Sequence, residues 1–137
     1  QAFIALCRDN ATRKEIDDIV FGAITKARNG NLDKRLIVMR SRLGKNPESY
    51  GNQGGFQGAA KRYNQKNANK FVAGEGVPHI YTTKGMEAFK TDEERESLSV
   101  DWTTVIAKQI IAPVALIYDA MGWEQPDASG ARAKPLF

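Results

Sequence analysis

Hydrophobic positions recur with helical spacing between residues 13 and 28. They are Ile16, Ile19, Val20, Ala23, Ile24 and Ala27. Steps of three and one place all six on one face of a helix. Thr12 opens the capping-box pattern that starts a helix, and Asn29-Gly30 supplies a left-handed stop. The pattern predicts an amphipathic helix over residues 13–28. Gly22 lies opposite its apolar face, which suggests a close contact there, at a cost of about 1 kcal/mol relative to Ala.

The next apolar stretch predicts a second helix from Leu32 to Leu43. Its apolar residues are spaced four, three and four apart, and Gly44 follows as a terminator. The two helices would form an αα-hairpin, of which a DNA-reading helix-turn-helix is the rarer form. The run LIVMR, from Leu36 to Arg40, also fits a strand, because short apolar runs do not separate helix from strand.

Residues 44–76 have a different composition, with seven of the twelve glycines, five Asn and few apolar residues. Such segments are typical of loops or of arms that order on binding. We therefore predict a flexible basic Gly/Asn-rich arm, within which residues 59–71 could form a short basic helix.

The pattern after the arm begins with an extended segment. Val77 to Thr83 reads as a strand, and Pro78 favours an edge position because it lacks an N–H. A short helix is expected around residues 85–89. Thr91 then begins a second capping box, which opens the acidic stretch TDEERESL. Acidic residues at a helix start complement its dipole.

The last strong element is a long apolar helix from about Trp102 to Met121. Pro113 would kink or split it, and Gly122 would end it. Residues 110–118 are apolar almost all round, so we expect them at the centre of the core. The polar residues 124–137 are expected to form an extended tail.

These elements predict a mainly α fold. The expected architecture is a small helical bundle, built from the α-hairpin and the long kinked C-terminal helix, with a basic arm and an extended tail. We expect one domain overall. Its parts would be the hairpin segment 1–43, the arm 44–76, the helical core 77–123 and the tail 124–137.

Composition removes several classes of protein. Of 137 residues, 42% are hydrophobic, too many for a wholly disordered chain. No uninterrupted apolar run reaches 18 residues, so no membrane span is expected. One Cys and one His exclude a disulfide framework and a zinc site with several such ligands. Residues 1–8 lack the pattern of a signal peptide. We expect an intracellular (cytoplasmic) protein or a virion component, without cofactor or metal.

The net charge of +4 hides a strong asymmetry along the chain. Residues 1–25 carry −1, residues 26–70 carry +9 and residues 71–137 carry −4. A basic block of this kind is typical of proteins that bind a polyanion. A solvated basic surface that balances the acidic one is the alternative.

The candidate nucleic-acid-binding residues combine cations with interleaved aromatics. They are Lys34, Arg35, Arg40, Arg42, Lys45, Lys61, Arg62, Tyr63, Lys66, Lys70 and Phe71. Cations neutralise phosphates with release of counterions, and aromatic faces stack on unpaired bases. The competing interpretation is a flexible linker whose aromatics dock on the domain itself or on a neighbouring subunit. Trp123, Leu136 and Phe137 are the candidate subunit-interface residues, because large apolar side chains anchor interfaces.

Catalytic patterns are weak. The phosphate-loop, dinucleotide and zinc-protease motifs do not occur. His79 and Cys7 are more simply structural residues, and the acids at 92–96 match the dipole of a helix start.

We therefore expect a non-enzymatic structural protein that binds the phosphate backbone of RNA or DNA largely without sequence specificity. Its most concrete form is a self-assembling, homo-oligomeric viral coat or nucleoprotein-type subunit. The alternative is a phage or viral protein-binding inhibitor or assembly factor whose basic arm contacts an acidic protein partner. A metal-dependent nuclease using the acids at 92–96 is the weakest hypothesis.

Overall fold

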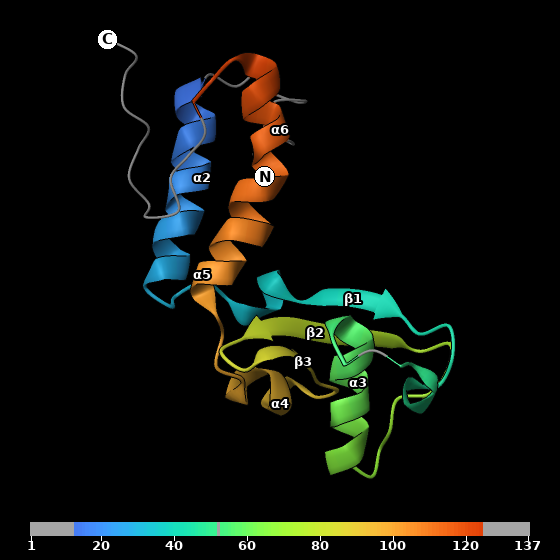
Figure 1. The fold of residues 1–137 in the computed structure, drawn as a ribbon. Helices are drawn as coiled ribbons and strands as arrows, with labels where there is room; N and C mark the ends of the chain where they lie inside the picture. Colours follow the sequence, from blue (N-terminus) through green and yellow to red (C-terminus); the bar gives the residue numbers. More distant parts are fainter. Residues whose placement is uncertain (1–12, 52, 125–137) are drawn as a thin grey trace. The chain divides into compact units, whose positions relative to one another are not determined.

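The computed structural model describes residues 13–51 and 53–124 (Figure 1). The chain divides into two compact units. The helical unit comprises Gln1–Leu32 with Trp102–Phe137, and the sheet unit comprises Asp33–Asp101. About 55% of the structure is helical, and a small antiparallel sheet accompanies the helices. The fold is therefore mixed α/β. The expected high helix content is confirmed, whereas the expected purely helical bundle is not.

The helical unit begins with α2, Arg13–Arg28, which has the predicted bounds. Its buried residues are Ile16, Val20, Phe21, Ile24 and Ala27. Gly30, two residues after the helix, adopts φ +69°, as expected for a left-handed stop. A Cβ placed on Gly22 would meet nothing within 4 Å, so the suggested close contact at this position is absent.

The second helical stretch of this unit runs from Trp102 to Met121 in three segments. These are α5 (Trp102–Val105), a π-helical stretch (Ile106–Ile111) and α6 (Ala112–Met121). Pro113 stands in the first turn of α6. There its missing N–H is best tolerated, and the wide π turns precede it. Gly122 ends α6 at φ +72°, so both the interruption and the stop follow the prediction.

The core of the helical unit lies between α2 and the Trp102–Met121 helix. Of residues 110–118, however, only Tyr118 is fully buried, and Leu116 is 77% exposed. The expectation that this stretch forms the centre of a core was wrong, because α2 covers one side of the helix. By length and composition alone, Trp102–Met121 could cross a membrane, and only 17% of its most apolar stretch is buried in the structure. The length of the longest apolar run does not reveal this property, because the polar residues Lys108 and Gln109 interrupt the apolar sequence of the helix. The expectation that the chain has no membrane span therefore stays a prediction.

The sheet unit contains three antiparallel strands in the order β1-β2-β3. They are β1 (Met39–Arg42), β2 (Gly76–Thr82) and β3 (Gly85–Ala88). β2 was predicted as a strand, but it is central and not at an edge. Its Pro78 carbonyl accepts from the Phe89 N–H, just beyond β3. The missing proline N–H therefore falls where the ladder ends, so the sheet tolerates proline in a central strand. β3 replaces the short helix expected there.

The predicted helix from Leu32 to Leu43 does not form. Lys34–Ile37 is a single 3₁₀ turn, and β1 follows it. The predicted αα-hairpin and helix-turn-helix are therefore both wrong. The alternative prediction of a strand over LIVMR is confirmed for its last two residues, Met39 and Arg40, which begin β1. Pairing of β1 with β2 supplies the backbone hydrogen bonds that a helix would have made internally.

The segment expected to be a flexible arm is folded into the sheet unit. It contains a 3₁₀ turn (Pro47–Ser49) and α3 (Gly55–Lys66), which packs on β3 and β2. Ala59 and Ala60 are buried on the face of α3 that packs on the sheet. A basic helix was expected in this region, but it begins four residues earlier than predicted. The capping box at Thr91 is present and opens α4, Asp92–Ser97.

Candidate functional site

The predicted nucleic-acid-binding residues all lie in the sheet unit, from Lys34 to Phe71. Of the candidate interface residues, Trp123 lies in the helical unit, where its ring packs edge-on against Tyr118 at 5.4 Å. Leu136 and Phe137 lie outside the described residues. The sheet unit carries twelve basic and nine acidic side chains, a net charge of +3. Folding thus brings the basic block and much of the acidic C-terminal half into one unit.

Several of the predicted cations are held by backbone carbonyls of this unit. The Lys34 ammonium donates to the carbonyls of Glu96 (2.7 Å) and Leu98 (3.0 Å). The Lys61 ammonium donates to the Tyr50 carbonyl at 3.2 Å. These contacts tie loops together, and they leave the ammonium groups less free to contact phosphate.

Two arginines are also engaged. The Arg62 guanidinium donates to the carbonyls of Gln53 (2.7 Å) and Met86 (2.8 Å). Arg35 pairs with Asp33 at 2.7 Å. Its hydrogen bonds lower the pKa of the Asp33 carboxyl to about 2. The Arg35 charge is therefore already neutralised by a neighbour in the sequence.

Four predicted cations remain exposed with neither an ion pair nor a contact to an aromatic ring among residues 13–51 and 53–124. They are Arg40, Arg42, Lys66 and Lys70. Lys84, in the turn between β2 and β3, shares this condition, but it lies outside the basic block and sequence reasoning missed it. Lys45 is exposed and lies over the Tyr50 ring at 4.8 Å.

Most acids of the sheet unit, by contrast, have partners inside the protein. Ion pairs engage Asp33, Glu75, Asp92 and Glu96. The Glu94 carboxylate accepts from the Lys90 and Thr91 N–H groups and from the Tyr63 hydroxyl. Burial raises its pKa, but these hydrogen bonds outweigh burial and leave the pKa lowered. The free charge of this unit is therefore mainly positive.

The exposed cations lie on two faces of the sheet. Side chains alternate along a strand, so Arg40 and Arg42 share one face of β1. α3 covers the other face, where the Phe56 ring stacks on His79 at 5.8 Å. The predicted residues therefore form two groups on opposite faces, which sequence order alone could not show.

The lysines of the α3 face gather around residues 48–50. Lys45 covers the Tyr50 ring and Lys61 binds the Tyr50 carbonyl. The pKa of Glu48 is lowered first by the hydrogen bond from Asn64 and further by the charges of Lys70 and Lys61. The charges of Lys61 and Lys70, nine positions apart, thus both act on the Glu48 carboxylate.

The aromatic residues of the predicted site serve mainly inside the unit. Phe71 is 2% exposed and packs against Tyr63 at 5.0 Å between ring centroids. The Tyr63 hydroxyl donates to both Glu94 oxygens, at 3.0 and 2.9 Å. Burial and this carboxylate raise the pKa of Tyr63 to about 12. Phe71 offers no exposed face to a base, so it is a core residue in this structure.

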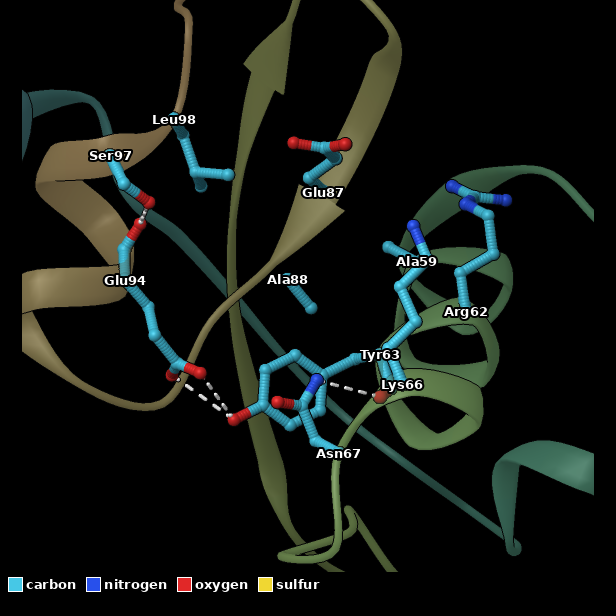
Figure 2. A pocket seen from close by; sticks show the side chains of 10 residues that line it. All are labelled: Ala59, Arg62, Tyr63, Lys66, Asn67, Glu87, Ala88, Glu94, Ser97 and Leu98. Atoms are coloured by element: carbon cyan, nitrogen blue, oxygen red, sulfur yellow. Dashed lines mark hydrogen bonds between the residues drawn. The ribbon is translucent and has the colours of Figure 1, made fainter.

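A pocket of about 220 Å³ lies between α3, β3 and α4 (Figure 2). Arg62, Tyr63 and Lys66 line one wall, and Glu87 and Glu94 come from the other side. The pocket therefore combines two cations with two carboxylates. No signal in the sequence could have indicated it, because three separate elements form its walls.

The histidine singled out in the sequence lies in the interior of the sheet unit. His79 is 3% exposed, and its Nδ1 lies 2.8 Å from the Val77 carbonyl. Burial lowers its pKa, with a smaller opposing effect of that hydrogen bond. Over residues 13–51 and 53–124, no group of three His, Cys, Asp or Glu side chains could hold a metal ion.

No protein-family model and no curated protein sequence matches this chain.

Proposed function

We propose that this protein is a non-enzymatic nucleic-acid-binding protein that contacts the phosphate backbone of RNA or DNA. The observation that supports the proposal is the unequal use of charge within the sheet unit. Its acids are largely engaged by internal partners, whereas Arg40, Arg42, Lys66 and Lys70 are exposed and free of ion pairs among the described residues. Exposed cations without partners can neutralise phosphates and release the counterions condensed on them.

The proposal includes low sequence specificity. Base reading needs side chains that reach base edges or stack on bases, and cations that contact phosphate position the protein without reading sequence. Tyr63 and Phe71 are occupied in the core, which leaves cations as the main contacts. A self-assembling, homo-oligomeric coat or nucleoprotein-type subunit is the form we favour, because such proteins bind nucleic acid through many weak, repeated contacts.

A salt titration tests the proposal. Binding of a fluorescent single-stranded oligonucleotide and of a duplex would be followed by anisotropy between about 50 and 300 mM salt. Affinity should fall linearly in a plot of log K against log salt. In the double variant Lys66→Glu, Lys70→Glu the single-strand slope should decrease by about 1.4, the value for two lost phosphate contacts.

The matched control carries the same change of net charge in the helical unit. Lys14 and Lys26 are both exposed on α2, so Lys14→Glu, Lys26→Glu should leave the slope nearly unchanged. Absence of binding at about 50 mM salt, or binding without a salt slope, would overturn the proposal. An equal decrease of the salt slope in both double variants would show that binding depends on the net charge of the protein and not on a defined surface.

A further inference from the structure

The two edges of the sheet differ in how their backbone groups are used. Along β2, the Pro78 carbonyl faces β3, because it accepts from the Phe89 N–H. The paired residues Met39↔His79 and Ser41↔Val77 are then the hydrogen-bonded pairs between β1 and β2. The N–H and C=O groups of Arg40 and Arg42 consequently point away from the sheet, along the outer edge of β1.

The opposite edge, at β3, is covered. Met86 pairs with Tyr81 in the alternate register, so its carbonyl points outward from the sheet. The Arg62 guanidinium donates to that carbonyl at 2.8 Å. At the β1 edge, no hydrogen bond from residues 13–51 or 53–124 reaches the outward groups of Arg40 or Arg42. One edge is therefore capped by a side chain of α3, and the other is open.

The surroundings of the open edge favour an extended ligand. Arg40 and Arg42 are exposed on the same face of β1, and their partners on β2 are Pro78 and Gly76. These neighbours are compact, so both guanidinium groups are accessible beside the edge. Two cations at alternate positions match a strand that carries acidic side chains at alternate positions, since directly opposed residues lie about 5 Å apart.

We propose that the β1 edge binds an extended acidic segment of another protein as an additional strand of the sheet. Strand addition uses the outward backbone groups of Arg40 and Arg42 for affinity, and the two guanidinium groups for selection of acidic residues. Self-pairing of two β1 edges is disfavoured, because antiparallel copies would oppose arginines to arginines. This proposal shares Arg40 and Arg42 with the proposed nucleic-acid surface, but strand addition at the β1 edge does not require nucleic-acid binding.

The experiment uses the full chain and a capped seven-residue peptide that alternates Glu with Thr or Val. Binding would be followed by NMR of ¹⁵N-labelled protein. The amides of Arg40 and Arg42 should shift and become protected from hydrogen exchange. A matched peptide with Lys in place of Glu should bind at least about tenfold more weakly, as expected for charge-assisted contacts.

A pair of variants separates the backbone from the charge. Arg40→Gln removes the guanidinium and keeps the N–H. Arg40→Pro removes both, without loss of a sheet bond, because this N–H points outward. The proline variant should bind the acidic peptide about fivefold more weakly than the glutamine variant, the effect of one lost hydrogen bond. Unchanged amide protection in β2 and β3 would confirm that the sheet remains intact in both variants.

Three results would overturn the proposal. Equal affinities of the two Arg40 variants would show that strand addition does not occur. Concentration-dependent dimers that disappear in Arg40→Pro would assign the edge to a second copy of the chain. An oligonucleotide that shifts the guanidinium signals, while the peptide at about 1 mM protects neither amide, would assign these arginines to nucleic acid. Failure of nucleic-acid binding alone would leave the proposal standing.

Discussion

At the scale of single residues, two glycines within helices have opposite roles. Gly22 in α2 is exposed, and a Cβ there would meet nothing within 4 Å. Gly58 in α3 is buried, and a Cβ there would lie 1.8 Å from the Gln53 carbonyl oxygen. Glycine at position 58 lets the chain before α3 approach the helix, whereas glycine at position 22 has no such structural reason.

We therefore predict opposite effects of the same substitution. Gly22→Ala should raise the free energy of unfolding by about 0.5–1 kcal/mol, because alanine is the better helix former. Gly58→Ala should lower it by about 1–3 kcal/mol, because the added methyl group forces the backbone apart. Urea denaturation of both variants measures the two changes. A stable Gly58→Ala variant would show that residues 53–58 adjust without cost.

The aromatic residues show how a compositional signal can mislead. Tyr63 and Phe71 occur among lysines and asparagines, which is also the composition of single-strand binding segments. In the structure, Asn64 explains the arrangement, because its side chain accepts from the Phe71 N–H (2.7 Å) and donates to the Phe71 carbonyl (2.9 Å). This buried amide closes the loop after α3 and holds Phe71 in the core.

At the scale of elements, a helix or strand was predicted correctly where the sequence pattern that defines it lies within a few residues of the chain. α2 followed the prediction because its apolar spacing and its stop lie within the helix or beside it. α4 followed because a capping box is a contact between residues three apart. β1 did not follow, because its apolar run is too short to define a period and its hydrogen-bond partner, β2, is distant in the sequence.

Tyr118 joins the two helical stretches of the helical unit. It is fully buried, and its hydroxyl donates to the Asp17 carboxylate of α2. Burial, followed by this carboxylate, raises the pKa of Tyr118 well above its usual value. We predict that Tyr118→Phe lowers the free energy of unfolding by about 1.5–3 kcal/mol, as expected for a hydrogen bond to a charged group.

Chemical denaturation of the Tyr118→Phe variant measures this loss. The matched test adds Asp17→Asn, alone and together with Tyr118→Phe. This change removes the carboxylate that loses its hydrogen-bond donor when Tyr118 becomes phenylalanine. The double variant should lose less than the sum of the two single losses, because the side chains are in contact. Full additivity would show that the hydroxyl contributes nothing through Asp17.

At the scale of the whole molecule, the charge asymmetry of the sequence is largely reduced by folding. The acids of residues 75–101 and the bases of residues 34–70 belong to one unit with a net charge of +3. Lys90 shows the mixing, since it binds the Lys70 carbonyl at 2.9 Å and lies 3.9 Å from Glu75. Fewer cations are exposed without an ion pair among the described residues than the sequence suggests, and substitutions at these positions test nucleic-acid binding.

The stability of the protein should also depend on pH through its single histidine. Burial lowers the pKa of His79 below its ordinary value of 6.5. The unfolded chain therefore binds the proton more readily, and the contribution of neutral His79, fully present above about pH 6.5, is lost as pH falls through the folded pKa. We predict a decrease in the free energy of unfolding between about pH 7 and pH 5.

Denaturation curves at several pH values test this prediction, with His79→Gln as the control. The variant should lose the pH dependence in this window while it keeps the decrease at lower pH that arises from Glu94, whose pKa is lowered. An unchanged slope in the variant would assign the effect to another group. The result depends on tertiary burial, which a lone histidine in a sequence does not reveal.

The sequence by itself determined the features that rest on neighbours along the chain. These are α2 and its stop, the capping box of α4, the interruption at Pro113 and the excess of basic residues between 26 and 70. Each depends on backbone preferences or spacing within a few residues, where physical chemistry acts locally.

The tertiary structure decided which surfaces remain for function. It placed β1 and β3 on either side of β2, turned the expected arm into α3, and engaged Arg62 while it left Arg40 and Arg42 free at an open edge. The physical reason is that strand pairing and burial join residues far apart in the sequence, and each buried polar group must find a partner there. The exposed cations that form no such contacts among the described residues define the candidate site.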